Sequence, residues 1–136
     1  MKEIYLEIIT PSKSVFKGQV KSVTVPGSLG NFQMLFNHAP LISSLEIGKI
    51  NLVDINDKEI QLVTGGGTVE VKENKILILA DSIETLDELD VERAKKSYQR
   101  AKERLANRKS DVDFVRAELS LNRALNRLKF AKVSVN

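Results

Sequence analysis

The chain has 136 residues, no cysteine, no tryptophan and a single histidine, His38. Without cysteine, disulfides and thiolate metal sites are excluded, and one histidine excludes a zinc site built from several imidazoles. No apolar run approaches the roughly 20 residues that a membrane-spanning helix needs. The first residues alternate polar and apolar side chains, unlike the apolar segment of a signal peptide. We therefore expect a soluble, intracellular protein that needs no metal.

Glycine and proline are missing from the second half of the chain, where the charge also changes sign. All seven glycines and all three prolines lie at or before Gly67. Residues 90–136 hold 13 basic and 6 acidic residues, a balance of +7, whereas residues 1–89 hold 8 basic and 12 acidic residues. Because glycine and proline mark reversals of chain direction, the two parts should differ in structure.

Short apolar segments separated by turn residues fill the first 80 residues. The alternation of Ile4, Leu6 and Ile8 with polar residues is typical of a half-buried strand. Further strands are expected at residues 20–25, 32–36, 41–42, 50–55, 59–64, 68–71 and 75–79, with a flexible turn at the three glycines 65–67. This spacing predicts an all-β sandwich of two antiparallel sheets, because no helical segment separates the strands.

The pattern after residue 90 is helical. One stripe with steps of three and four consists of Val91, Ala94, Tyr98, Ala101 and Leu105, and a second of Phe114, Ala117, Leu121, Ala124 and Leu128. The interruption at residues 107–110 is short, so an antiparallel α-helical hairpin is expected. We thus predict two domains, a β-sandwich at residues 1–85 and a helical hairpin at 86–136, without internal repeats.

Signatures of catalysis are absent from the sequence. The glycines at 65–67 are not followed by the lysine of a phosphate-binding P-loop, and there is no G-x-S-x-G nucleophile motif. His38 lies in a turn beside Pro40, a context more typical of a structural hydrogen bond than of a catalytic base. The sequence therefore gives no positive indication of an enzyme.

Arginines of the two predicted helices indicate an anion site. Arg93 and Arg100 are seven residues apart, and Arg123 and Arg127 are four apart, so each pair shares a helix face. An antiparallel hairpin brings Arg93 near the second pair, and guanidinium groups suit phosphate oxygens. Alternatively, the arginines lie on solvated faces and pair with Glu92, Glu103 and Glu118. Nucleic-acid binding is disfavoured, because the few aromatic residues here fall mainly on the apolar stripes.

Several motifs resemble one family along nearly the whole chain. They are V-P-G at 25–27 with Gly30 and H-A-P-L at 38–41, T-G-G-G-T-V-E-V at 64–71, L-D-V-E-R-A at 89–94, and R-A-E-L at 116–119 with R-A-L-N-R-L at 123–128. In this order and spacing they resemble the epsilon subunit of bacterial F-type ATP synthases. Phe36 and Asn37 depart from the usual Pro-Gly before the H-A-P motif, which affects the shape of this loop.

This resemblance implies a non-catalytic regulatory subunit of the central stalk in a proton-translocating complex that synthesises ATP. The implied partners are the gamma subunit of the stalk, the membrane c-ring and the alpha/beta catalytic head, without nucleic acid and without membrane insertion. The complex would place the chain peripherally at the cytoplasmic face of the cell membrane. The hairpin would restrain ATP hydrolysis by changing between two states. In one it is folded with ATP bound, and in the other it extends into the catalytic head.

The resemblance also implies particular site residues. Those expected to bind ATP as a regulatory ligand are Asp90, Arg93, Ala94, Arg123 and Arg127, with Glu84 and Arg100 as weaker candidates. Those expected to contact partners are Phe36, His38, Leu41 and Ile42, although the apolar ones also fit a core. No metal is required by the sequence. A different class remains open, a free-standing ATP- or anion-sensing adaptor with no rotary partner.

Overall fold

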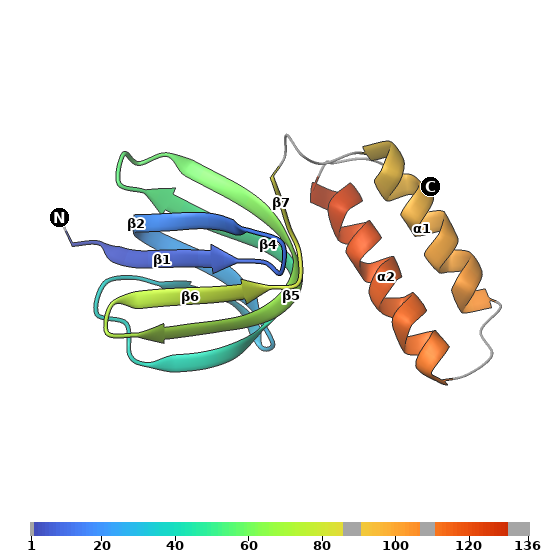
Figure 1. Cartoon of the computed structure of the whole chain (residues 1–136), viewed down its shortest axis with the longest axis horizontal. Helices are drawn as coiled ribbons and strands as arrows, with labels where there is room; N and C mark the ends of the chain where they lie inside the picture. Colours follow the sequence, from blue (N-terminus) through green and yellow to red (C-terminus); the bar gives the residue numbers. More distant parts are fainter. Residues whose placement is uncertain (1, 86–90, 107–110, 131–136) are drawn as a thin grey trace. The chain divides into compact units, whose positions relative to one another are not determined.

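The computed structural model describes residues 2–85, 91–106 and 111–130 (Figure 1). The chain divides into two compact units, Met1–Thr85 and Leu86–Asn136. The first unit contains β1 (Ile4–Ile9), β2 (Ser14–Gly27), β3 (Gly30–Met34), β4 (Leu41–Asp54), β5 (Glu59–Lys72), β6 (Lys75–Ala80) and β7 (Ile83–Thr85), and the second contains α1 (Val91–Ala106) and α2 (Asp111–Phe130). The fold class predicted from the sequence, strands followed by a two-helix region, is confirmed.

The strands of the first unit form a closed ring. Their order is β1-β6-β5-β4-β2-β3, and β1 also pairs with β2, so five strands close on themselves while β3 and β7 extend the edges. The expectation of purely antiparallel pairing is wrong at one place, because β1 and β6 are parallel from Tyr5 opposite Lys75 to Ile9 opposite Leu79. Directions cannot alternate around a ring with an odd number of strands, so one parallel pair is unavoidable.

The three glycines at 65–67 lie inside β5 and do not form a turn, contrary to the sequence expectation. Gly67 has a φ of 145°, and a Cβ atom there would lie 2.0 Å from the carbonyl oxygen of Leu79. The backbone of β5 thus passes so close to the end of β6 that only glycine fits. Expected strands 59–64 and 68–71 are therefore halves of one 14-residue strand, and segments 41–42 and 50–55 likewise belong to β4.

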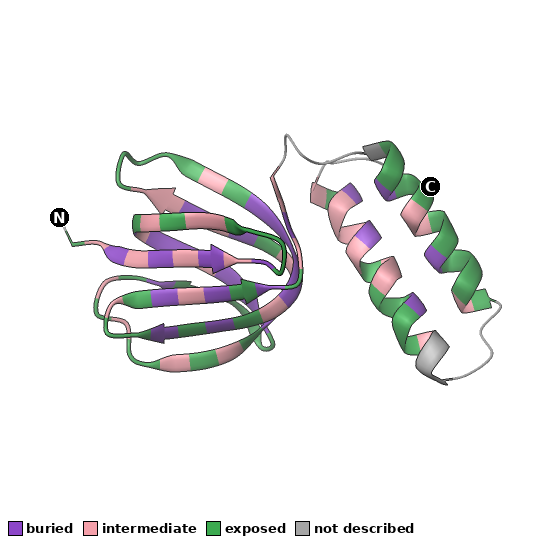
Figure 2. Ribbon diagram, viewed as in Figure 1, coloured by how far each residue is buried: buried purple, intermediate pink, exposed green. Residues whose placement is uncertain are grey.

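Large aliphatic side chains fill the interior of the ring. The buried cluster contains Ile4, Leu6, Ile8, Val20, Val23, Val25, Met34, Leu45, Ile50, Leu52, Leu62, Val69, Val71, Ile76, Ile78, Ala80 and Ile83. They alternate with more exposed residues along β1 and β6 (Figure 2). This alternation is what the sequence pattern predicted, and it fixes the register of each strand.

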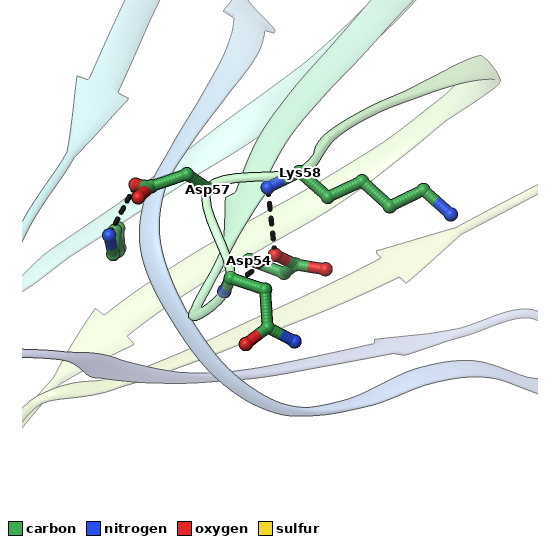
Figure 3. A network of polar contacts seen from close by, with 5 residues as sticks. Asp54, Asp57 and Lys58 are labelled. Carbon is green, nitrogen blue, oxygen red and sulfur yellow. Dashed lines mark hydrogen bonds and ion pairs between the residues drawn. The ribbon is translucent and has the colours of Figure 1, made fainter.

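The turn between β4 and β5 is held by one carboxylate. The Oδ1 atom of Asp54 accepts hydrogen bonds from the backbone N–H groups of Asn56 at 2.8 Å and Lys58 at 2.9 Å (Figure 3). Asp57, in the left-handed region at a φ of 64°, forms an ion pair with Lys21 of β2. The side chains of Asp54 and Asp57 thus both stabilise this turn.

The two helices of the second unit pack side by side and run antiparallel (Figure 1). Their common seam buries Ala94, Ala101, Ala117, Ala124 and Leu128. The seam follows the apolar stripes that the sequence indicated, and it consists mostly of alanine. Within the described residues, no helix is both long and apolar enough to span a membrane.

Candidate functional site

Each arginine expected to bind ATP directly precedes a residue of the hairpin seam. Arg93 and Arg100 precede buried Ala94 and Ala101 on α1, and on α2 Arg123 precedes Ala124 and Arg127 precedes Leu128. One residue corresponds to a rotation of about 100° around a helix axis, so each arginine flanks the seam. The sequence had placed these residues on helix faces; the burial pattern now places them beside the packed interface.

The antiparallel arrangement puts all of these arginines on one side of the hairpin. In two facing helices that run in opposite directions, positions just before the seam residues fall on the same side of both. We call the side formed by positions directly preceding seam residues the arginine edge. Because the first turn of α1 lies beside the last turns of α2 (Figure 1), Arg93 and Arg127 occupy the same end of this edge.

A surface hollow of about 610 Å³ lies on the outward face of α1 and reaches the arginine edge at Arg93 and Arg100. It is lined by Arg93, Lys95, Lys96, Gln99 and Arg100. Among the described residues that line it, four are cations and Gln99 offers amide donors, so this part of the lining favours an anion. Sequence reasoning missed Lys95, Lys96 and Gln99. Their proximity in the chain to Arg93 was the available signal, but helical spacing alone gave no reason to prefer them over other surface residues.

The described arginines differ in exposure and partners. Arg93 and Arg100 are exposed, whereas Arg123 and Arg127 are half-buried. An Nη2–H of Arg100 donates to the Ser97 hydroxyl at 3.3 Å, which directs this guanidinium along its own helix. The structure therefore combines exposed donors on α1 with half-buried ones on α2, and a phosphate ligand could be bound from both helices.

The other residues expected at the ATP site have different positions. Ala94 is 2% exposed and belongs to the seam, so its side chain packs against α2 and offers little surface to a ligand. Glu84 belongs to β7 of the first unit, where it is opposite Val63 of β5. Asp90 lies outside the described residues. Glu118, one candidate for an alternative ion pair, follows Ala117 and so lies on the opposite side of the seam.

The residues expected to contact partners lie around the start of β4 in the first unit. Leu41 packs against the core, and half-buried Phe36 has the Nζ atom of Lys2 5.2 Å from its ring centre. The Nδ1 atom of His38 is 2.7 Å from the carbonyl oxygen of Ala39. Ile42 alone of the four is a largely exposed apolar residue, at 75%, so it is the one that fits a docking surface.

Ile42 belongs to a row of side chains that crosses the outer surface of four further strands. Strand pairing aligns Ile42 with Glu70, Leu77, Glu7 and Lys17 in succession. A hollow of about 400 Å³ lies beside this row and is lined by Tyr5, Glu7, Lys17, Lys75, Ile76 and Leu77. Leu79, on the next outward position of β6, is 45% exposed. We call this surface the outer face; the sequence suggested its Ile42 end but not its β6 part.

Comparisons with known proteins agree with this two-part organisation. Residues 3–86 match the family described as ATP synthase, Delta/Epsilon chain, beta-sandwich domain. Residues 87–132 match ATP synthase, Delta/Epsilon chain, long alpha-helix domain. A solved structure of the Euglena gracilis mitochondrial ATP synthase, OSCP/F1/c-ring, contains a chain with a TM-score of 0.81 and 20% identity, covering 97% of this chain and 82% of that one. At this identity the likeness concerns the fold.

Curated relatives match over almost their full length. The ATP synthase epsilon chain of Desulforamulus reducens is 42% identical over 127 residues, covering 93% of this chain and 96% of that protein. The ATP synthase epsilon chain of Bacillus pumilus is 41% identical over 131 residues, covering 96% and 98%. Both domains, in the same order, are thus shared with proteins of one kind. The chain belongs to the epsilon-chain family of ATP synthases, as its motifs predicted.

Proposed function

We propose that the chain is a non-catalytic central-stalk subunit of a proton-translocating F-type ATP synthase, and that its hairpin regulates ATP hydrolysis by binding ATP. One observation carries the regulatory part of this proposal. Arginines from two different helices lie on one edge, and they do so only while the helices are packed against each other. A ligand that contacts both helices therefore stabilises the folded hairpin.

The small energy of the seam makes such control feasible. Alanine contributes little apolar area, so the packed hairpin has only a modest advantage over an open one. Helices of 16 and 20 residues are marginal without packing partners. Each 1.4 kcal/mol of differential binding changes the ratio of closed to open hairpin about tenfold. ATP at cellular concentration then favours the closed state, and its depletion releases the helices toward the alpha/beta catalytic head.

The partners follow from the surfaces of the two units. The outer face combines exposed apolar residues, Ile42 and Leu79, with charges of both signs, a composition suited to the gamma subunit and the membrane c-ring. The basic hairpin is suited to an acidic surface of the catalytic head, where its +7 balance would speed docking. In this assembly the chain is peripheral, on the cytoplasmic face of the cell membrane.

Calorimetric titration of the full-length protein with ATP tests the ligand part. Arg93→Gln and Arg127→Gln, each removing a charge-assisted contact of about 1.5–3 kcal/mol, should weaken binding roughly 10- to 100-fold. Lys102→Gln is the matched control, since Lys102 follows seam residue Ala101 and lies on the opposite edge. No heat at millimolar ATP, or equal affinity in all three variants, would exclude the ATP-regulated hairpin.

Assembly is tested separately with the full-length protein and its synthase. Ile42→Asp and Leu79→Asp place a charge in the outer face and should reduce co-purification with the stalk subunits. Ile55→Asp is the control, because Ile55 is similarly exposed at 49% but lies in the β4–β5 turn. Recovery of the parent protein as an abundant free monomer in native extracts would instead favour the free-standing adaptor.

A further inference from the structure

The two helices carry the same sequence pattern, which contradicts the expectation of no internal repeat. Residues 93–104 and 116–127 both read Arg-Ala-x-x-Ser-x-x-Arg-Ala-x-x-Arg. The structure gives the matching alanines and serines the same environment. Ala94 and Ala117 are 2% and 1% exposed, and Ser97 and Ser120 are both half-buried. In the sequence, Asp90 and Asp113 extend the repeat by three residues. Two copies of one amphipathic unit therefore form the hairpin.

This repeat accounts for the composition of the arginine edge. Four positions of each helix lie on this edge, directly before a buried seam residue or a half-buried residue of the same apolar stripe: Arg93, Ser97, Arg100 and Arg104 on α1, and Arg116, Ser120, Arg123 and Arg127 on α2. Within the two repeats no acidic residue occupies an edge position. Each helix contributes one hydroxyl group among three guanidinium groups, and Arg100 donates a hydrogen bond to Ser97. The whole edge thus consists of cations and groups that can donate to an anion.

The antiparallel arrangement makes the two ends of the edge equivalent. Arg93 and Arg127 share one end, and Arg104 and Arg116 share the other. Each end thus combines the first arginine of one repeat with the last arginine of the other. Eleven helical residues separate Arg93 from Arg104, a distance of about 16 Å along the axis. The proposed ATP residues Arg93 and Arg127 occupy only the first end, so the proposed function does not account for Arg104 and Arg116.

We propose that the arginine edge binds a linear phosphate chain longer than a triphosphate, from the Arg93–Arg127 end to the Arg104–Arg116 end. The inference deepens the proposed function, because it uses the same edge. Inorganic polyphosphate carries a charge on every repeating unit. It is also thin enough to lie between the two rows of arginines that form this edge, one row on each helix. An acidic helix, by contrast, presents its carboxylates at intervals of a turn and is too wide to lie between both rows. The guanidinium fork also matches adjacent phosphate oxygens.

Calorimetry with the full-length protein tests this inference with two probes, tripolyphosphate and a polyphosphate several times longer. The longer chain should bind at least about tenfold more tightly. The double variant Arg104→Gln/Arg116→Gln should remove most of this gain while changing the tripolyphosphate affinity by less than about threefold. Both positions are exposed and glutamine has good helix propensity, so the fold should persist. Unchanged far-UV circular dichroism checks this.

Matched controls separate a specific edge from general charge. Lys102→Gln/Lys129→Gln removes the same number of charges from the opposite edge, since both lysines follow seam residues. The inference is overturned if the two double variants lose equal affinity, if chain length has no effect, or if polyglutamate of matched charge binds equally well. If the parent protein does not bind ATP but binds polyphosphate in a length-dependent way, only the ATP proposal is overturned.

Discussion

The two units of this protein differ in how much apolar surface each buries in its own interior. The sandwich buries a cluster of Ile, Leu and Val side chains from every strand of its closed ring. The seam of the hairpin buries four alanines and Leu128. Burial of a large aliphatic side chain stabilises by about 1.5–3 kcal/mol, and alanine contributes far less. Buried apolar area thus stabilises the sandwich far more than the hairpin, which is consistent with the proposed control of the hairpin by a ligand.

The two units also differ in how their charges are arranged. Charged residues of the sandwich occur with both signs across the outer face, for instance Glu7 opposite Lys17. The edge positions of the hairpin repeats bear arginines and serines, without a carboxylate. Like charges on one edge oppose closure, and a bound polyanion reverses this effect. Low apolar burial and concentrated positive charge therefore both favour the proposed dependence of the closed hairpin on a ligand.

The largest predicted effect concerns the rigid unit. Gly67→Ala places a Cβ atom 2.0 Å from the carbonyl oxygen of Leu79, so β5 and β6 must separate, at a cost above about 4 kcal/mol. Gly30→Ala is the control: its φ is also positive, at 120°, yet a Cβ atom there meets nothing within 4 Å. Chemical denaturation should show a loss limited to backbone strain, about 1–3 kcal/mol, for the control. Equal losses in both variants would contradict the close approach.

A pair of core truncations tests whether the two units unfold separately. Ile78→Ala in the sandwich should lower the free energy of unfolding of that unit by about 2–5 kcal/mol. Leu128→Ala should destabilise the hairpin by about 2–3 kcal/mol and increase hydrogen exchange in α1 and α2. Amide exchange in β1–β6 should be unaffected by the second variant. A parallel increase in both units would show that they form one cooperative structure.

Local patterns in the sequence predicted much of the sandwich, but closure of the ring required tertiary information. The alternation around Ile4, Leu6 and Ile8 correctly indicated a half-buried strand. The glycines at 65–67 were misread as a turn, because their role depends on Leu79, which is adjacent only in the folded chain. The parallel pairing of β1 and β6 likewise follows from the number of strands in the ring.

The candidate site was predictable in its arginines and less so in its extent. Helical spacing identified Arg93, Arg123 and Arg127, since a period of 3.6 residues needs no tertiary information. The lysines that line the hollow with Arg93 could not be distinguished from ordinary surface residues. The proposed roles of Arg104 and Arg116 emerge only after the seam is known, because the edge is defined by residues that precede buried or half-buried residues of the apolar stripes.

A third prediction uses the ligand to sharpen the contrast between the units. ATP at 100 times its dissociation constant should stabilise the closed hairpin by about 2.7 kcal/mol, provided that it does not bind the open form. Hydrogen exchange in α1 and α2 should slow accordingly, whereas exchange in the core of the sandwich should change little. At the same ATP concentration, Arg127→Gln should reduce this stabilisation to about 0.4–1.4 kcal/mol, because its binding is 10- to 100-fold weaker. Slowing of equal size in β5 or β6 would contradict control restricted to the hairpin.

The smallest predicted effect lies at the surface of the sandwich. Asp57→Asn removes the ion pair with Lys21, but Asp57 is 75% exposed, so the loss should stay below about 1 kcal/mol and vanish at high salt. Asparagine tolerates the positive φ of this position, so backbone strain should not confuse the result.

Asp54→Ala, in the same turn, should cost about 1–2 kcal/mol because two backbone N–H groups lose their acceptor. Urea denaturation followed by circular dichroism measures both. If Asp57→Asn lowered the free energy of unfolding more than Asp54→Ala, surface ion pairs would contribute more to the sandwich than the backbone hydrogen bonds of its turns. The contrast between a sandwich stabilised by backbone geometry and apolar burial and a hairpin controlled by charge would then be lost.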